Sequence, residues 1–368
     1  MANTGHADGA GEGTGGAGEA AGGAGERAGG PGLRGSRRPL CEVYDTALLD
    51  LDGVVYLGGS AVAGAPQALA KASAAGMRLA FVTNNSSRTP SAVAAQLSGL
   101  GVPVTAADVV TSAQAAARLL AGRLPAGAPV LVVGGIGLRA ALRERGLRPV
   151  SVAAERPAAV VQGYAPDISY SLLAEGGLAV AAGAWFVASN GDETLPTPRG
   201  RQPGNGALAQ VIATATGQQP VFAGKPEPPL HAEAIARTGA RHPLVVGDRL
   251  DTDIEGAIRG GADSLLVLTG VSRPADVVLA PSSRRPAFVA ADLTGLLEPH
   301  PAVERAAGAA GAFRLGGWTA RRDEAGRLQL SGNGERIDGL RALCAAAWSG
   351  GQVTAELAAP ALQSLGTG

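Results

Sequence analysis

Between about Tyr44 and Gly270, short apolar segments alternate with longer alanine-rich segments that read as helices. The apolar segments, such as "VLVV" at 130–133 and "PLVV" at 243–246, are hydrophobic throughout rather than at every second position. Strands of this kind are buried on both faces, which is typical of parallel sheets covered by helices. The chain therefore predicts an α/β fold built on parallel sheets.

Polar side chains follow several of these predicted strands. In chain order they are Asp50 and Asp52, Thr83 and Asn84, Lys225, and Asp248 and Asp253. Taken singly, each has an ordinary explanation as a helix cap, a turn residue or a solvated lysine. Ligands of parallel sheets bind at the carboxyl ends of the strands, so the sheet would bring the whole set to one edge.

The set has a common chemical logic. Two acidic clusters held together require a cation, and hard carboxylate oxygens favour Mg²⁺. A carboxylate beside Mg²⁺ can attack phosphorus and form an aspartyl-phosphate, while a hydroxyl, turn amides and a lysine hold the phosphoryl oxygens. A second carboxylate one residue away can protonate the leaving oxygen and later activate water. The pattern predicts phosphoryl transfer.

Four of these segments resemble the motifs of the haloacid dehalogenase (HAD) superfamily. They are "DLDGVVY" (50–56), "VTNNSSR" (82–88), "GKP" (224–226) and "GDRLDTDI" (247–254). Their spacing is similar to that of the NagD-like (class IIA) branch, in which a large cap lies between the second and third motifs. The resemblance implies a Rossmann-like parallel-sheet core with an inserted α/β cap domain and, here, a small C-terminal extension.

The resemblance also implies catalytic roles. Asp50 would be the nucleophile and Asp52 the general acid and base. Thr83 would hold the phosphoryl group, with Asn84 in the same loop, and Lys225 would stabilise both the nucleophile and the phosphate. An aspartate at position 52 is a mark of the phosphatases and phosphomutases in the superfamily, and members that dehalogenate lack it.

The implied cofactor is Mg²⁺. Its ligands would be the Asp50 side chain, the Asp52 carbonyl and Asp248, with Asp253 supporting them from the outer shell. From the residues alone, Asp251 is expected to cap a helix that begins near Thr252.

The chain divides into four parts by composition and resemblance. Large apolar residues are nearly absent from 1–38, which predicts a disordered segment. The HAD catalytic core is expected at 40–110 and 218–298, the cap at 111–217, and a small C-terminal unit at 300–368. Within that unit we expect a hairpin around 323–326 followed by an amphipathic helix.

Substrate choice is expected to lie with the cap, where the candidate contacts are Tyr164, Asn190, Asp192 and Arg199. The resemblance implies a small phosphomonoester as the partner, and the C-terminal segment is similar to that of actinobacterial members that include glycerol-3-phosphate phosphatases. Glycerol 3-phosphate is therefore the first expectation. Phosphoglycolate, a nucleotide, pyridoxal phosphate or a sugar phosphate are the alternatives within the family.

Some residues of the sequence also suggest other classes of function. Gly135-x-Gly137-x-x-Ala140, with Glu155 further on, has the arithmetic of an NAD-binding turn. That reading leaves the acidic strand ends unexplained. A non-catalytic phosphoacceptor would lack the long insertion and the carboxylate at position 52. A catalytically idle binding protein would not need the complete motif set.

Composition bounds the partners and the compartment. Lys plus Arg and Asp plus Glu number 31 each, so no overall charge favours nucleic acid or an anionic membrane. The longest apolar stretch, 178–188, is too short to span a bilayer, and no secretory signal is recognisable. With Cys41 and Cys344 as the only cysteines, a cytoplasmic location is expected. A homodimer is a possible state, since cap-mediated dimers are common in the family.

Overall fold

The computed structural model describes residues 32–197, 199–306 and 311–366. Most of the segment expected to be disordered, residues 1–31, lies outside them. The rest of that segment pairs with the folded chain: the Arg34 amide donates to the Ala287 carbonyl (2.8 Å), and Ser36 forms a β-bridge with His300. Nowhere in these ranges is a helix long and apolar enough to cross a membrane.

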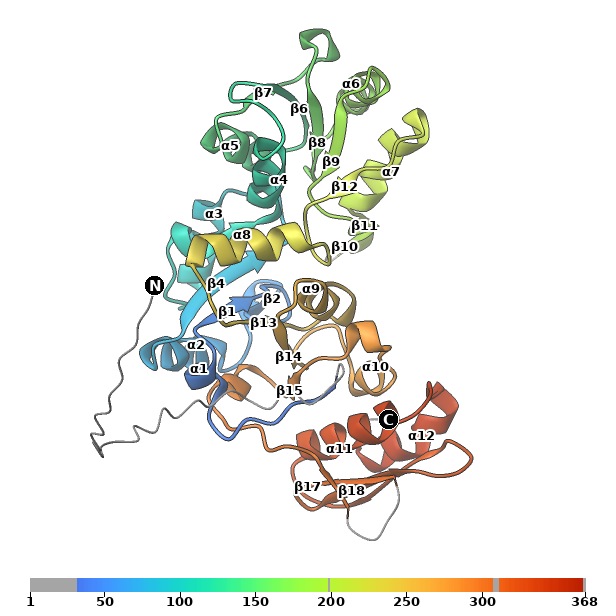
Figure 1. Ribbon diagram of the computed structural model, residues 1–368. Helices are drawn as coiled ribbons and strands as arrows, with labels where there is room; N and C mark the ends of the chain where they lie inside the picture. Colours follow the sequence, from blue (N-terminus) through green and yellow to red (C-terminus); the bar gives the residue numbers. More distant parts are fainter. Residues whose placement is uncertain (1–31, 198, 307–310, 367–368) are drawn as a thin grey trace, which may run out of the picture.

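The first sheet has six parallel strands and confirms the predicted parallel α/β core (Figure 1). In spatial order they are β15 (Phe288–Ala290), β14 (Asp263–Val267), β13 (Pro243–Gly247), β1 (Thr46–Leu49), β4 (Arg78–Thr83) and β5 (Val109–Thr111). Because β1 lies between β13 and β4, the ends of these three strands are neighbours. The strands that precede the predicted site residues are thus brought together.

Helices cover both faces of this sheet. They are α1 (Leu40–Val43), α2 (Ala65–Ala74), α3 (Pro90–Gly99), α4 (Ser112–Ala121), α8 (Pro228–Thr238), α9 (Glu255–Arg259) and α10 (Pro274–Val278). Alternate residues of β1 enter two hydrophobic clusters, Ala47 and Leu49 with α2 and α3, and Leu48 with α4 and α8. This two-sided burial explains why the strands are apolar throughout. A short hairpin, β2 (Tyr56–Leu57) with β3 (Ser60–Ala61), follows β1.

A second parallel sheet is inserted between β5 and α8 (Figure 1). Its strands in spatial order are β12 (Val221–Phe222), β9 (Trp185–Ala188), β8 (Ala159–Gln162), β6 (Pro129–Val133) and β7 (Arg148–Val150). With them are α5 (Ile136–Glu144), α6 (Tyr170–Ala181), α7 (Asn205–Thr216) and the hairpin β10 (Thr194–Thr197) and β11 (Gly200–Pro203). We call residues 129–222 the second-sheet unit.

The second-sheet unit packs against the loop that follows β4. A Cβ at Gly137, in α5, would lie 2.4 Å from the Ser86 carbonyl oxygen and 2.7 Å from that of Arg88. Only a glycine allows this approach of helix to loop. The glycines of the NAD-like turn are therefore explained by packing.

The C-terminal unit is an antiparallel sheet with two helices. Its elements are β16 (Glu304–Arg305), β17 (Ala312–Leu315), β18 (Trp318–Arg322), β19 (Leu328–Gly332), α11 (Arg336–Trp348) and α12 (Ala355–Ser364). The predicted hairpin is β18–β19 and the predicted helix is α11. Trp348 Nε1 donates to the Val278 carbonyl (3.2 Å), and apolar residues of α11 and α12 join those of α10 and β15 in one cluster. The unit is thus bound to the edge of the first sheet.

Candidate active site

Asp50 directly follows β1 and is still held by the sheet, because its amide donates to the Val246 carbonyl of β13 (2.8 Å). The chain then turns at Gly53, which has φ +84°. A Cβ on Gly53 would lie 2.4 Å from Asp248 Oδ2. Glycine at this position serves both the turn and the close approach of the next carboxylate.

Lys225 lies in the loop between β12 and α8, and its side chain is almost fully buried. The ammonium forms an ion pair with Asp50 Oδ1 and with Asp253 Oδ1 (2.7 Å), and it donates to the Val82 carbonyl (3.4 Å). Burial lowers the pKa of Lys225, but the two carboxylates outweigh it and hold that pKa above its usual value. Lys225 therefore stays charged beside Asp50.

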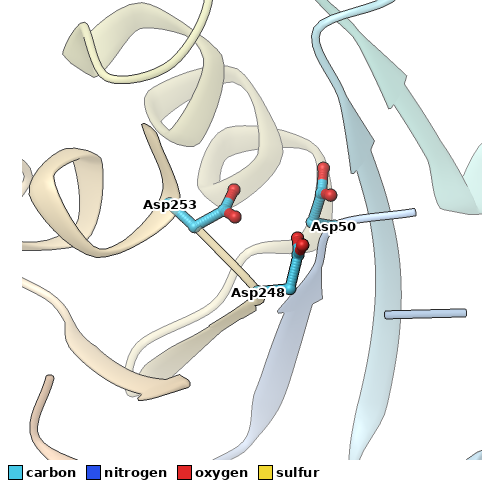
Figure 2. Close-up of side chains that lie close together, drawn as sticks. All are labelled: Asp50, Asp248 and Asp253. Carbon is cyan, nitrogen blue, oxygen red and sulfur yellow. The ribbon is translucent and has the colours of Figure 1, made fainter. Parts of the chain in front are cut away.

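Asp248 directly follows β13 and lies next to Asp50, as Figure 2 shows. Its Oδ2 accepts from the Val271 amide (2.6 Å), while its buried Oδ1 has no hydrogen-bond partner among the described residues. Burial and the Asp253 carboxylate raise the pKa of Asp248 to about 6. Burial also raises the pKa of Asp50; Lys225 opposes this, and the other two carboxylates add to it.

The three carboxylates of Asp50, Asp248 and Asp253 can each place an oxygen within 4.8 Å of the others. Among the described residues, Lys225 is the one cation that forms an ion pair with Asp50 or Asp253, so the cluster carries an excess of negative charge. A buried carboxylate oxygen without a partner is costly unless a cation satisfies it. The donor set is all oxygen and fits Mg²⁺.

Asp253 differs from the other two. Its Oδ1 is engaged by Lys225, and its Oδ2 accepts from the Arg249 amide (3.1 Å). Both oxygens are thus occupied within the protein, whereas Asp248 keeps one free. This arrangement suits an outer-shell place for Asp253.

Asp52 is not a member of this three-carboxylate cluster, and it is exposed to solvent. The Tyr56 hydroxyl donates to Asp52 Oδ2 (3.3 Å). Partial burial raises the pKa of the Asp52 carboxyl, against the lowering effects of Tyr56 and Lys225. A carboxyl with a raised pKa that faces solvent is placed to exchange protons.

Thr83 and Asn84 lie at the end of β4, on the other side of β1. Thr83 is buried, and its Oγ1 accepts from the Asn85 amide (3.1 Å), which shapes the loop. The Asn84 side chain points to the main chain of Lys225, with Oδ1 accepting from its amide (2.8 Å) and Nδ2 donating to its carbonyl (3.2 Å).

Two of the four candidates of the second-sheet unit reach this edge. Asn190 Nδ2 donates to the Asn84 carbonyl (2.7 Å), and Asp192 Oδ2 accepts from Asn84 Nδ2 (3.2 Å). Burial raises the pKa of Asp192. Tyr164 is half-buried in the loop after β8, and Arg199 is exposed in the turn of the β10–β11 hairpin. No side-chain hydrogen bond or ion pair of these two joins them to the first sheet within the described ranges.

Some contacts of the site were not predicted. Asp251 does not cap the helix near Thr252, because its carboxylate pairs with the Arg249 guanidinium (3.0 and 2.9 Å). Tyr56 and Val271 also bind site carboxylates. Tyr56 lies inside the first motif, but neither tyrosine chemistry nor a main-chain amide gives a sequence signal for such a contact.

Comparisons with known proteins identify the family. A model described as haloacid dehalogenase-like hydrolase matches residues 47–148, and a second HAD-hydrolase-like model matches 222–296. A D-glycerol 3-phosphate phosphatase of Mycobacterium tuberculosis is 50% identical over 259 residues, which span 70% of this chain and 72% of the relative. The chain belongs to the haloacid dehalogenase-like hydrolases.

Other relatives of this HAD hydrolase are also phosphatases. The 5'-nucleotidase YutF of Bacillus subtilis is 40% identical over 63% of this chain and 90% of its own length. The crystal structure of glycerol phosphate phosphatase Rv1692 from Mycobacterium tuberculosis in complex with magnesium has a TM-score of 0.81 and 43% identity, covering 90% of this chain and 100% of that one.

The C-terminal unit also has a match. A model described as GCN5-related N-acetyltransferase-like covers residues 315–367. No family was predicted for this unit from the sequence, because its hairpin and helix contain no strand-end motif of the kind that marks the core.

Proposed function

We propose that this HAD hydrolase is a Mg²⁺-dependent phosphatase of small phosphomonoesters that works through an aspartyl-phosphate on Asp50. The observation that carries the proposal is the cluster of Asp50, Asp248 and Asp253 at one strand edge, in which Lys225 pairs with Asp50 and Asp253 while a buried oxygen of Asp248 has no hydrogen-bond partner among the described residues. The phosphatase names of the relatives support the same reaction class.

In the first half-reaction, a carboxylate oxygen of Asp50 attacks phosphorus. The bond from this oxygen to phosphorus forms as the bond from phosphorus to the leaving oxygen breaks. Asp52 gives its proton to the leaving oxygen, and its raised pKa favours the protonated form that this step needs. The product alcohol departs and Asp50 carries the phosphoryl group.

In the second half-reaction, water attacks the phosphorus of the aspartyl-phosphate. Asp52, now ionised, accepts a proton from this water, and the bond between phosphorus and the Asp50 oxygen breaks. Phosphate leaves, and both aspartates return to their starting states. A carboxylate that can serve in both halves explains why two aspartates one residue apart are useful here.

Charge neutralisation comes from the groups around Asp50. Lys225 would lie against the phosphoryl oxygens as well as Asp50, and the Thr83 hydroxyl would donate to them. The residues that would hold Mg²⁺ are Asp50, the Asp52 carbonyl and Asp248, with Asp253 behind them. When bound there, the ion supplies positive charge against the phosphoryl oxygens.

Glycerol 3-phosphate is the proposed substrate, supported by the printed activity of the 50% identical relative. The runner-up substrates are nucleotides and sugar phosphates, which the 40% identical relatives name. The second-sheet unit would act as the cap that reads the leaving group, with Tyr164, Asn190, Asp192 and Arg199 as candidate contacts. Asn190 and Asp192 have the stronger support, because they lie beside the loop after β4.

The proposed setting is the cytoplasm, where Cys41 and Cys344 would remain free thiols, as they are here. We also propose the domain division at 40–110 with 218–298 and at 111–217, and a homodimer as the working state. Light scattering of the purified protein tests the last point.

The test of the function is a panel of phosphomonoesters assayed with Mg²⁺ and ranked by kcat/KM. We expect glycerol 3-phosphate to rank first and Asp50→Asn to lower kcat by about 10⁴-fold or more, since the nucleophile is lost. Survival of phosphate release in Asp50→Asn would refute the assigned mechanism. A low rank for glycerol 3-phosphate would remove the substrate and leave the reaction class.

A further inference from the structure

The side chain of Asn84 joins three parts of the molecule. It belongs to the loop after β4, it binds the main chain of Lys225, and it contacts Asp192 of the second-sheet unit. Within the described residues, both main-chain hydrogen bonds of Lys225 go to this one amide. The residue that neutralises Asp50 therefore depends on a neighbouring side chain for the position of its backbone.

The loop that carries Lys225 is built for this contact. It lies between β12 and α8, so no sheet ladder or helix holds it. A Cβ at Gly224 would lie 2.5 Å from Asn84 Oδ1. The glycine of the "GKP" motif is thus the residue that lets the amide reach the Lys225 backbone.

Asn84 is itself held from two sides. Its carbonyl accepts from Ser112 Oγ (2.6 Å), at the start of α4, and from Asn190 Nδ2 (2.7 Å). The Asn190 carbonyl in turn accepts from Asn205 Nδ2 of α7 (2.7 Å), so the second-sheet unit is firmly connected to the loop after β4.

The Asn84 amide nitrogen has two hydrogens, and both are used. One goes to the Lys225 carbonyl and the other to Asp192 Oδ2, each at 3.2 Å. The Asp192 main chain is anchored in the second-sheet unit, because its carbonyl accepts from the Gly206 amide of α7 (2.8 Å). The same amide group thus contacts the lysine loop and the docked second-sheet unit.

We propose that Asn84 is a positioning residue that aligns Lys225 with Asp50, and that Asp192 makes this alignment depend on docking of the second-sheet unit. The kinetic part of the idea rests on the proposed phosphatase function. The ammonium of Lys225 is fully aligned only while Asp192 holds the Asn84 amide in place. Closure of the unit over a substrate and assembly of the charged site are then one event.

Kinetics of Asn84→Ala, Asp192→Ala and the double variant with 4-nitrophenyl phosphate and Mg²⁺ test the proposal. A small displacement of a catalytic group costs up to about 10²-fold in rate, so Asn84→Ala should lower kcat by about that factor. In Asn84→Ala, KM should change by less than about threefold, because the Asn84 side chain is not a proposed substrate contact. Asp192→Ala should lower kcat by about tenfold through a weaker form of the same displacement.

The double variant should be no slower than Asn84→Ala, because Asp192 acts through Asn84. If the kcat losses of the two single variants multiply in the double variant, Asp192 does not act through Asn84 and this part of the proposal is wrong. The matched control is Ser264→Ala, which removes another buried side-chain hydrogen bond, the one that Ser264 Oγ accepts from the Ala287 amide (3.4 Å), and whose partner is neither Asn84 nor Lys225. It should keep kcat within about twofold. A loss in the control equal to that of Asn84→Ala would show a general loss of structure and reject the positioning role.

Hydrogen exchange at the Lys225 amide gives a readout that needs no activity. This amide donates to Asn84 Oδ1, so its exchange should be at least about tenfold faster in Asn84→Ala and unchanged in Ser264→Ala. Unchanged exchange in Asn84→Ala would reject the positioning role whatever the kinetics. If the wild type releases no phosphate from any ester, the proposed function fails, and the exchange measurement still decides this proposal.

Discussion

Among the described residues, the candidate site and a cluster around Glu233 are two buried charged groups that differ in their balance of charge. In the site, the Lys225 ammonium pairs with Asp50 and Asp253, and the carboxylate of Asp248 lies in the same cluster. The second cluster surrounds Glu233 of α8, whose carboxylate is completely buried.

In the Glu233 cluster one carboxylate receives three guanidinium groups. Glu233 Oε1 accepts from Arg145 (2.6 Å) and Arg237 (2.5 Å), and Oε2 accepts from Arg118 (3.2 Å). These residues connect α4, α8 and the end of α5, so the cluster ties the first sheet to the second-sheet unit. Both carboxylate oxygens of Glu233 are thus paired with guanidinium groups.

The contrast separates structure from chemistry. A cluster that only holds elements together satisfies its buried charge in full, as Glu233 does. The site leaves a buried Asp248 oxygen without a partner and an excess of carboxylates. Such a cluster of carboxylates destabilises the folded protein by itself, and a bound cation would stabilise it. The predictions below test this difference.

The largest effect is expected for Asp248→Asn. It should lower kcat/KM by at least about 10²-fold, because the free carboxylate oxygen proposed to bind Mg²⁺ is lost. Stability should change in opposite directions with and without the ion. In EDTA the variant should unfold at a higher temperature than the wild type, since burial and Asp253 already raise the Asp248 pKa to about 6.

With Mg²⁺ the order should reverse. A ligand at a hundred times its Kd adds about 2.7 kcal/mol to the stability of the protein that binds it, and the variant should lose most of this. Thermal unfolding of both proteins in EDTA and in Mg²⁺ is the measurement. An equal Mg²⁺ shift in the two proteins would show that Asp248 is not a ligand.

The two clusters also differ in how far the sequence predicts them. Asp50 and Asp248 were predictable because each directly follows an apolar strand, and parallel strands end at a common edge. The contacts of Asn84 with Lys225 and of Asp192 with Asn84 were not, because they join loops far apart in the chain. A sequence pattern gives loop identities but not their relative placement.

The burial of Glu233 was even less predictable from the sequence. This residue lies in a helical segment beside Arg237, which by itself indicates an ordinary surface pair. Its burial depends on Arg118 and Arg145, which arrive from separate elements. The fold class was predictable because the apolar pattern is local, whereas the pairing of Glu233 with two arginines that are distant in the chain is set by the tertiary structure.

Glu233→Gln is the second prediction. It removes the charge and keeps the shape, leaving three guanidinium groups without their partner. Breaking a buried pair costs about 3–5 kcal/mol, and these arginines are partly exposed, so we expect a loss of about 2–3 kcal/mol. The value of kcat should stay within about twofold, because none of these groups lies in the site.

Denaturant unfolding of Glu233→Gln against the wild type measures this loss. The matched control is Glu155→Gln, which removes the exposed pair with Arg148 (2.8 Å) and should cost less than about 0.5 kcal/mol. Equal losses in the two variants would mean that burial adds nothing to the Glu233 cluster.

The smallest effect is expected for His300, a buried histidine whose ring is neutral in the folded protein. His300 is buried between the first sheet and the C-terminal unit. Arg341 donates to its Nδ1 (2.8 Å), so Nε2 carries the proton and donates to the Gly295 carbonyl (2.7 Å). Burial, together with the charge of Arg341, lowers the pKa of His300 to about 4, against the raising effect of the hydrogen bond to Gly295.

The sign of the pH effect follows from this lowered pKa. In the unfolded chain a histidine has a pKa of about 6.5. Between about pH 6.5 and 4 the ring is therefore protonated in the unfolded chain and neutral in the folded protein. The contribution of His300 to stability is therefore complete above pH 6.5 and declines as the pH falls toward 4. At pH 5 the loss should be about 1–2 kcal/mol relative to pH 7.

His300→Gln should remove this part of the pH dependence of the unfolding free energy, measured by denaturant unfolding at pH 7 and pH 5. A variant with the same difference between the two pH values as the wild type would show that the ring of His300 is not the group that titrates.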